Sequence, residues 1–255
     1  MSPALPPETL DAIIDHLQDE RDTLKTCCTV SKSWVPRTRN HLFAWVRFNG
    51  SRLEEWKKIF PDPSNSPAHH TRSLYIYGVL AVTADWIRAF HNVEHLWIEH
   101  TERTPLVPFY ALSPAVKSLH LAHTTTDIFD LICSFPLLED LVLFDLLHSE
   151  VGELDTPSTS PKFTGYLDLN VEWGLDTVAY RLCTLPNGLR FTKITMEFGI
   201  GTIDPIMDLV SACSNTLESL TVNCFMMLGM FPSAYIIGQY LIAVRGRRIV
   251  EGAFP

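Results

Sequence analysis

One short pattern recurs along most of this chain and limits the folds that it can adopt. Seven segments carry a central aliphatic residue with a second apolar residue two positions later, and the central residues are Leu74, Leu96, Leu119, Leu141, Leu167, Ile194 and Leu220. They are separated by 22, 23, 22, 26, 27 and 26 residues. Apolar residues at alternate positions suit a strand that is buried on one face. A period of about 20 to 29 residues is typical of repeat solenoids.

Stretches with helical character lie between these expected strands, at residues 84–90, 127–135, 176–185 and 205–214. Alternation of strand and helix at this period predicts an α/β fold, with a parallel sheet on the concave face of a solenoid. We place about seven repeats in residues 71–224. A Pro-, Ser- and Thr-rich insertion at residues 152–165 accounts for the wider intervals. The alternative is an ordinary α/β sheet in which the spacing is a coincidence.

The period and the aliphatic positions resemble those of leucine-rich repeats. The chain departs from that family at its Asn or Cys position, which here holds Thr101, Thr124, Leu146 and Phe225. The resemblance is therefore to a divergent member, and it implies a protein-binding solenoid.

The first 48 residues contain two apolar stripes at helical spacing. Leu10, Ile13, Ile14 and Leu17 form one stripe, and Leu24, Cys27, Val30 and Trp34 form the other. Pro36 ends the second helix and suits the first turn of a third. Three helices in so few residues build a small core and leave apolar surface for a partner. A generic helical cap on a larger domain is the alternative.

The order of residues in this stretch resembles the F-box. The matching elements are Leu5-Pro6, Ile13 with Leu17, Val30-Ser31-Lys32-Ser33-Trp34, and the closing residues Leu42, Phe43 and Val46. The exit differs, because the family often has Leu-Trp where this chain reads Leu42-Phe43-Ala44-Trp45. The resemblance implies a module, residues 1–48, that docks the Skp-type linker of a cullin-RING ubiquitin ligase through Leu5, Pro6, Ile13, Leu17 and Val30. Trp34 is expected to pack the core of the module, and residues 49–70 are expected to be a linker.

The residue after each central aliphatic residue should point to the open face of the sheet. These residues are Tyr75, Trp97, His120, Val142, Asp168, Thr195 and Thr221, and the next row contains Tyr77, Glu99, Phe144, Asn170, Glu197 and Asn223. Grouped aromatic residues suit a protein-binding surface. From both rows we expect a target protein to be bound by Tyr75, Tyr77, Trp97, His120, Phe144, Asp168 and Thr195. The alternative is that this face is simply solvated.

Few residues suggest chemistry, since nucleotide-binding, phosphate-binding and hydrolase motifs are absent from the sequence. His100, His123 and Asp145 each lie four residues after a central aliphatic residue, so they should stack on neighbouring strands. Two imidazoles and a carboxylate can ligate zinc, and an enzyme with this site is one rival hypothesis. The default interpretation is that these three residues lie in a row of solvent-exposed turns. We expect no catalytic residue, no metal and no cofactor.

Charge and cysteine usage limit the partners and the compartment. A net charge of −9 argues against nucleic-acid binding. The six cysteines have no CxxC spacing and indicate reduced residues of a cytoplasmic or nuclear protein. The N-terminus shows no signal peptide.

The end of the chain is unusually apolar, with no charged residue from position 225 to 244. Residues 225–255 are expected to form an apolar cap over the last repeat, or a tail. Twenty uncharged residues can cross a bilayer, so a membrane tail anchor is a minor alternative. Against it, Gly229, Pro232 and Gly238 interrupt the run, and positive charge follows it. We do not expect membrane association.

Together, these features predict an F-box protein with divergent leucine-rich repeats. Such a chain would act as a substrate-recognition adaptor of a cullin-RING ubiquitin ligase, with the Skp-type linker, and through it a cullin, at one end and an unknown target protein at the other. A repeat scaffold without a ubiquitin role, possibly tail-anchored, is the second rival hypothesis.

Overall fold

The computed structural model describes residues 6–78, 83–101, 106–112, 114–124, 128–146, 160–171, 175–198, 204–227, 235–245 and 248–253. The chain begins with three short helices, α1 (Pro7–His16), α2 (Arg21–Val30) and α3 (Val35–Leu42). We call these three helices the helical module. Pro7 and Pro36 lie in first helical turns, where a missing N–H costs no hydrogen bond.

The helical module is held by a small apolar core and by one polar cluster. Ile14, Leu24 and Cys27 are buried. Asp15 on α1 accepts hydrogen bonds from Nε of Arg37 at 2.6 Å and from its Nη2. His41 Nε2 lies 2.8 Å from the same carboxylate. Because Arg37 and His41 belong to α3, this cluster ties the first helix to the third.

A ten-stranded sheet follows, and its strands lie side by side in chain order. The strands are β1 (Trp45–Phe48), β2 (Ser73–Tyr77), β3 (His95–Glu99), β4 (Ser118–Ala122), β5 (Asp140–Phe144), β6 (Tyr166–Asn170), β7 (Lys193–Phe198), β8 (Ser219–Met227), β9 (Tyr235–Arg245) and β10 (Arg248–Ala253). The first eight are parallel to one another. This is an open, solenoid-like α/β fold, as the repeat spacing predicts.

The register of the parallel strands matches the repeat pattern residue by residue. Leu74 pairs with Leu96, and the pairing continues through Leu119, Leu141, Leu167, Ile194 and Leu220. All seven central aliphatic residues therefore lie in one row. The predicted positions of these seven strands, β2 to β8, are confirmed.

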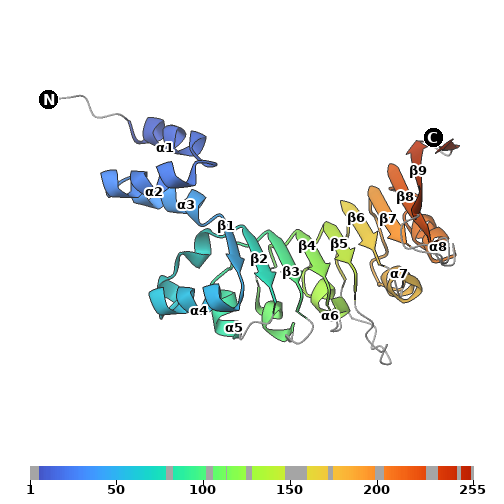
Figure 1. The fold of residues 1–255 in the computed structure, drawn as a ribbon, viewed down its shortest axis with the longest axis horizontal. Helices are drawn as coiled ribbons and strands as arrows, with labels where there is room; N and C mark the ends of the chain where they lie inside the picture. The colour runs from blue at the N-terminus through green and yellow to red at the C-terminus, as the bar shows by residue number, and fades with distance from the viewer. Residues whose placement is uncertain are drawn as a thin grey trace.

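Helices cover one face of the sheet and leave the other open (Figure 1). The covering elements are α4 (Gly50–Ile59), α5 (Ala84–Arg88), the 3-10 helix Val107–Ala111, α6 (Ile128–Cys133), α7 (Leu175–Cys183) and α8 (Asp204–Ala212). The row of strands bends towards its open side in the same view. The open face thus lies on the inside of the curve.

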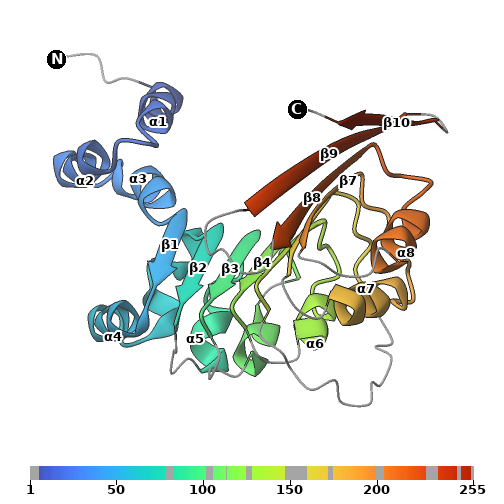
Figure 2. The same cartoon turned by 45° about the vertical axis from the view of Figure 1, so that its right-hand side comes forward.

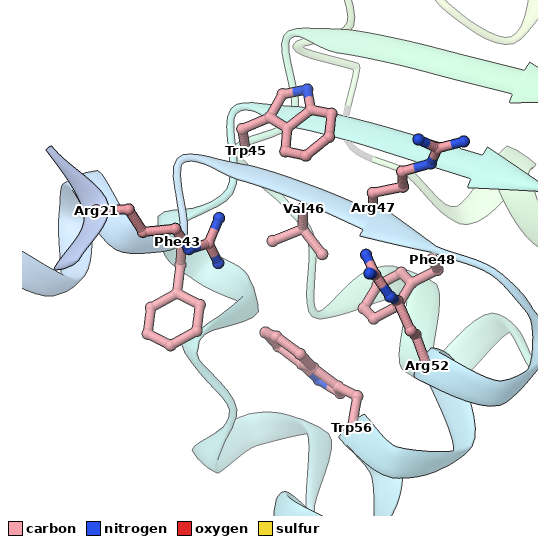
Figure 3. A pocket seen from close by; sticks show the side chains of 8 residues that line it. All are labelled: Arg21, Phe43, Trp45, Val46, Arg47, Phe48, Arg52 and Trp56. Atoms are coloured by element: carbon pink, nitrogen blue, oxygen red, sulfur yellow. The ribbon is translucent and has the colours of Figure 1, made fainter. Parts of the chain in front are cut away.

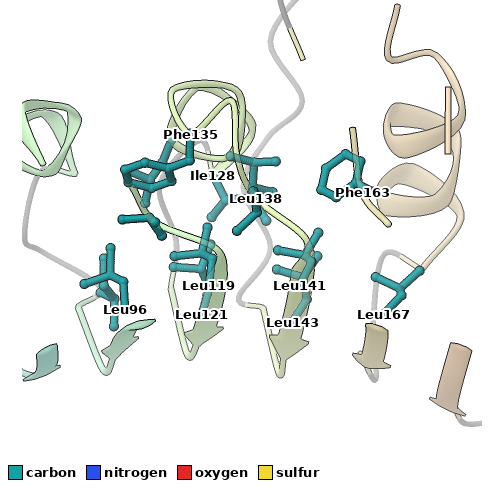
Figure 4. Packing of buried hydrophobic residues seen from close by; sticks show 14 of the residues in the cluster. Leu96, Leu119, Leu121, Ile128, Phe135, Leu138, Leu141, Leu143, Phe163 and Leu167 are labelled. Atoms are coloured by element: carbon teal, nitrogen blue, oxygen red, sulfur yellow. The ribbon is translucent and has the colours of Figure 1, made fainter. Parts of the chain in front are cut away.

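The core fills the space between the sheet and these helices. Leu119 and Leu121 of β4 and Leu141 and Leu143 of β5 are all 0% exposed. They point towards Phe135 and its neighbours beneath α6 (Figure 4). Burial of each such side chain stabilises the fold by about 1.5 to 3 kcal/mol.

The segment expected to be a linker, residues 49–70, is instead ordered structure. It forms α4 and two 3-10 helices, Pro63–Asn65 and Pro67–His70. The Asn49 side chain caps α4 by accepting from the Arg52 N–H at 3.0 Å. β1 completes an additional repeat, because Val46 pairs with Leu74. The solenoid therefore begins at residue 45, and the interpretation of residues 49–70 as a linker was wrong.

The C-terminal segment extends the sheet. β9 pairs antiparallel with β8, and β10 pairs antiparallel with β9. Figure 2 shows these strands at the end of the sheet opposite the helical module. No helix in the described part of the chain is long and apolar enough to cross a membrane.

Candidate functional site on the open face of the sheet

The residues expected to face outward form a row across the sheet. Register pairs link Tyr75 to Trp97, His120, Val142, Asp168, Thr195 and Thr221 in turn. Each of these side chains is half-buried. The residues directly before and after it in the same strand, which face the core, are buried or nearly so. Side chains at alternate strand positions point to opposite faces, so this row lies opposite the leucine core. The structure brings the predicted residues of this row together.

A second row lies two residues further along each strand. It links Tyr77, Glu99, Ala122, Phe144, Asn170, Glu197 and Asn223 in register. Tyr77 and Phe144 are 40% and 38% exposed. Exposed aromatic side chains of this kind supply apolar contact area to a protein partner.

The first strands of the open face carry a connected aromatic and charged group. The Arg47 guanidinium lies 4.5 Å from the centre of the Tyr75 ring, a cation–π contact. The Tyr75 hydroxyl donates a hydrogen bond to the Glu99 carboxylate. Burial and the nearby Glu99 carboxylate raise the pKa of Tyr75 to about 12. Tyr75 therefore acts as a neutral donor that holds Glu99 in place.

The later strands carry polar pairs instead. The Tyr166 hydroxyl donates to Asp168 at 2.7 Å, and the Asn170 amide donates to Glu197 at 2.5 Å. Burial raises the pKa of Tyr166 to about 12. The face thus divides into an aromatic half near β1 and a hydrogen-bonded polar half near β7.

His120 lies between these halves. Its pKa is lowered by burial, an effect that the nearby Glu99 and Asp168 carboxylates partly oppose. A lowered pKa favours the uncharged imidazole of His120.

The suspected zinc residues form a ladder at the carboxyl ends of β3, β4 and β5. His100, His123 and Asp145 have φ values of 54°, 50° and 41°. In this left-handed conformation, which His and Asp tolerate better than most residues, each backbone N–H reaches the next strand. The His100 and His123 N–H groups each donate at 3.1 Å, to the carbonyls of Ala122 and Phe144.

The side chains of this ladder are stacked. The His100 and His123 rings lie 4.2 Å apart at an angle of 14°, and Asp145 Oδ2 lies 2.9 Å from His123 Nδ1. Ligand atoms of Glu99, His100 and His123 lie within 4.8 Å of one another. The in-plane lone pairs of parallel rings run side by side, whereas a tetrahedral zinc ion needs them to converge. The carboxylate that lies within this distance of both imidazoles is that of Glu99, whereas the sequence spacing predicts Asp145 as the third residue of the group.

The residues expected to dock the Skp-type linker lie on the helical module, apart from the sheet (Figure 1). Ile13 and Val30 are 45% and 60% exposed. Pro6 is exposed and Leu17 is half-buried. Leu5 lies outside the described residues.

Sequence reasoning missed the contribution of β1 to the open face. Trp45 is 48% exposed and pairs with Ser73, while Arg47 pairs with Tyr75. The alternation in Trp45-Val46-Arg47-Phe48 was the available signal. This signal is ambiguous, because the same four residues also fit the apolar exit expected for the helical module.

A hollow of about 200 Å³ adjoins β1 where the helical module meets the sheet (Figure 3). It is lined by Arg21, Phe43, Trp45, Val46, Arg47, Phe48, Arg52 and Trp56. The Trp56 ring makes edge-on contacts with Phe43 at 5.8 Å and with Phe48 at 5.4 Å. These aromatic contacts join the end of α3 to the first repeat.

Comparison of the chain with protein-family models, with curated proteins and with solved structures returned no match.

Proposed function

We propose that this chain is a substrate-recognition adaptor of a cullin-RING ubiquitin ligase. In this proposal the helical module is an F-box that docks the Skp-type linker, and the divergent leucine-rich repeats hold a target protein on the open face. The chain itself would carry out no catalysis. It would raise the local concentration of the target at the ligase.

The observation that carries the proposal is the exposure of Ile13 and Val30. Both occupy F-box positions that the resemblance assigns to the linker interface, and both are exposed, whereas Leu10 and Leu17 of the same module are half-buried and Ile14 and Leu24 are buried. An aliphatic side chain left exposed costs hydration free energy that a partner can recover.

The open face supports the second half of the proposal. Its aromatic half offers Tyr77 and Phe144, which are exposed, together with the half-buried Trp97. Its polar half holds Asp168 and Glu197 in fixed hydrogen bonds. An aromatic region beside ordered polar groups is suited to binding a folded or extended protein segment.

Co-purification from cell extract tests the docking half. The wild-type chain should recover a Skp-type linker and a cullin, and Ile13→Asp and Val30→Asp should each lose them. Val107→Asp is the matched control, because Val107 is 65% exposed on the helical side of the solenoid. Recovery of neither partner by the wild-type chain, or equal recovery by all variants, would favour a repeat scaffold without a ubiquitin role.

A further inference from the structure

The first strand of the sheet has a free edge. β1 pairs with β2 on one side and is the outermost strand of the sheet. The Ala44 carbonyl accepts from the N–H groups of Arg72 and Ser73, at 2.9 Å each. In a parallel ladder, alternate residues bond to the same neighbour, so Ala44, Val46 and Phe48 bond towards β2. The backbone groups of Trp45 and Arg47 therefore point to the free edge, where they can pair with another strand.

The hollow of Figure 3 lies along this edge. Its walls come from α2, β1 and α4, and its floor includes Phe43 and Trp56. A second hollow, of about 340 Å³, is lined by Arg47, Asn49, Arg52 and Tyr77. Because Arg47 and Arg52 line both, the two hollows adjoin, and the second reaches Tyr77 on the open face. We call these two adjoining hollows together the depression beside β1.

The charge of this depression is opposite to that of the chain. Arg21, Arg47 and Arg52 line it, and no described lining residue is a carboxylate. None of these three arginines forms a direct ion pair with a described residue, in contrast to Arg37 and Arg88, which pair with Asp15 and Asp85. Arg47 lies over the Tyr75 ring, and Arg21 lies near the Asp22 carboxylate, whose pKa is lowered by Lys25 and, to a smaller extent, by Arg21. In a chain with a net charge of −9, three guanidinium groups gathered beside one strand without a direct ion pair are a local exception.

We propose that this depression binds an extended acidic segment of a partner protein, which adds a strand to the free edge of β1. Backbone groups of the segment would pair with Trp45 and Arg47, as in other cases of strand addition. Its carboxylates would meet Arg21, Arg47 and Arg52, since a guanidinium can donate two parallel hydrogen bonds to one carboxylate. Its apolar side chains would contact Phe43 and Trp56.

A peptide fits this site better than a nucleic acid does. The free edge presents alternating N–H and C=O groups, which match a peptide backbone and not a phosphodiester chain. Three arginines line the depression, whereas nucleic-acid binding needs a wider basic surface. The inference rests on the proposed function, because it names the chemistry of the target segment.

Fluorescence anisotropy with the full-length chain tests the inference. The probe is a labelled peptide of about eight residues that alternates Glu and Val, which is long enough to span β1 and its flanks. It should bind, and a Lys–Val peptide of the same length should not. Alternate N–H groups of the bound Glu–Val peptide should point towards β1, and the others should point away from it. N-methylation of the first set should weaken binding about tenfold, and N-methylation of the second set should have little effect.

Arginine variants test the charge contacts. Arg52→Ala should weaken binding of the Glu–Val peptide about fivefold, as expected for the loss of one charge-assisted hydrogen-bonding group. Arg88→Ala is the matched control, because Arg88 lies on α5 and pairs with Asp85 at 2.7 Å. It should leave binding unchanged.

Three outcomes would overturn the inference. These are equal binding of the Glu–Val and Lys–Val peptides, equal effects of the two arginine variants, and tight binding of a single-stranded oligonucleotide that competes with the peptide. The assay contains no Skp-type linker. Loss of peptide binding with linker docking intact therefore contradicts this inference alone, and loss of linker docking with peptide binding intact contradicts only the ligase role.

Discussion

Val46 on β1 pairs with Leu74 on β2 in the same register that joins Leu74 to Leu96 on the next strand. The first strand therefore belongs to the repeat array, and only Phe43 and Ala44 separate it from α3. Phe43 also contacts Trp56 of α4. The helical module is therefore held close to the sheet.

Truncation tests this boundary. A chain that begins at Ala44 retains β1, whereas a chain that begins at Asn49 loses Val46 and Phe48, which are 7% and 3% exposed. Loss of two core side chains should lower the melting temperature of the shorter chain by about 10 °C relative to the longer one. Differential scanning fluorimetry measures both. Equal melting temperatures would mean that β1 adds nothing to the solenoid.

Acid should weaken the helical module. The pKa of Asp15 lies well below its usual value of 3.8, because Arg37 and then His41 hydrogen-bond to its carboxylate. A lowered folded-state pKa stabilises the fold fully above the unfolded value, and this stabilisation is lost as the pH falls towards the folded value. Urea unfolding followed by helical circular dichroism should therefore show a loss of stability below about pH 4.

Asp15→Asn should remove most of that pH dependence and lower stability at neutral pH. Asp22→Asn is the control, since Asp22 pairs with Lys25 within α2 and ties no two helices together. It should have the smaller effect. If the free energy of unfolding had the same pH dependence in the wild-type chain and in Asp15→Asn, this cluster would have no role in holding α1 to α3.

The leucine row should dominate the stability of the solenoid. Leu119 is 0% exposed, so Leu119→Ala should lower the free energy of unfolding by about 2 to 5 kcal/mol. Leu137 is 55% exposed, and Leu137→Ala should change it by less than about 0.5 kcal/mol. Urea denaturation compares the two variants. Similar losses for both would place Leu119 outside the core.

The histidine ladder should not hold zinc. The parallel rings of His100 and His123 and the Asp145 contact to His123 favour stacking over coordination. Protein dialysed against zinc should therefore retain less than one equivalent by elemental analysis. One retained equivalent that is lost in both His100→Ala and His123→Ala would support the metal-enzyme hypothesis instead.

Sequence spacing predicted the central strands well, because a buried alternate residue in each strand leaves a regular apolar mark at a constant period. Leu74 to Leu220 all lie in register for this reason. The spacing did not identify β1, because Val46 and its neighbours also satisfy the apolar pattern expected at the end of the helical module. Local pattern alone does not distinguish a final helical contact from a first strand.

The contacts of the site were less predictable than its rows. Alternation placed Tyr75 and Glu99 on the open face, but their hydrogen bond depends on side-chain conformations across two strands. The depression beside β1 combines Arg21, Arg47 and Arg52 from three separate elements. Residues that meet only through tertiary packing leave no periodic signal.

The central claim is that the helical module docks a Skp-type linker, and a binding measurement with purified components tests it most directly. Isothermal titration calorimetry should detect a one-to-one complex between the full-length chain and a Skp-type linker at concentrations on the order of 10 μM or lower. Ile13→Asp should weaken that complex at least about tenfold, as expected for a residue near the centre of an interface. Absence of binding at that concentration, or equal affinity of the wild-type chain and Ile13→Asp, would contradict the claim.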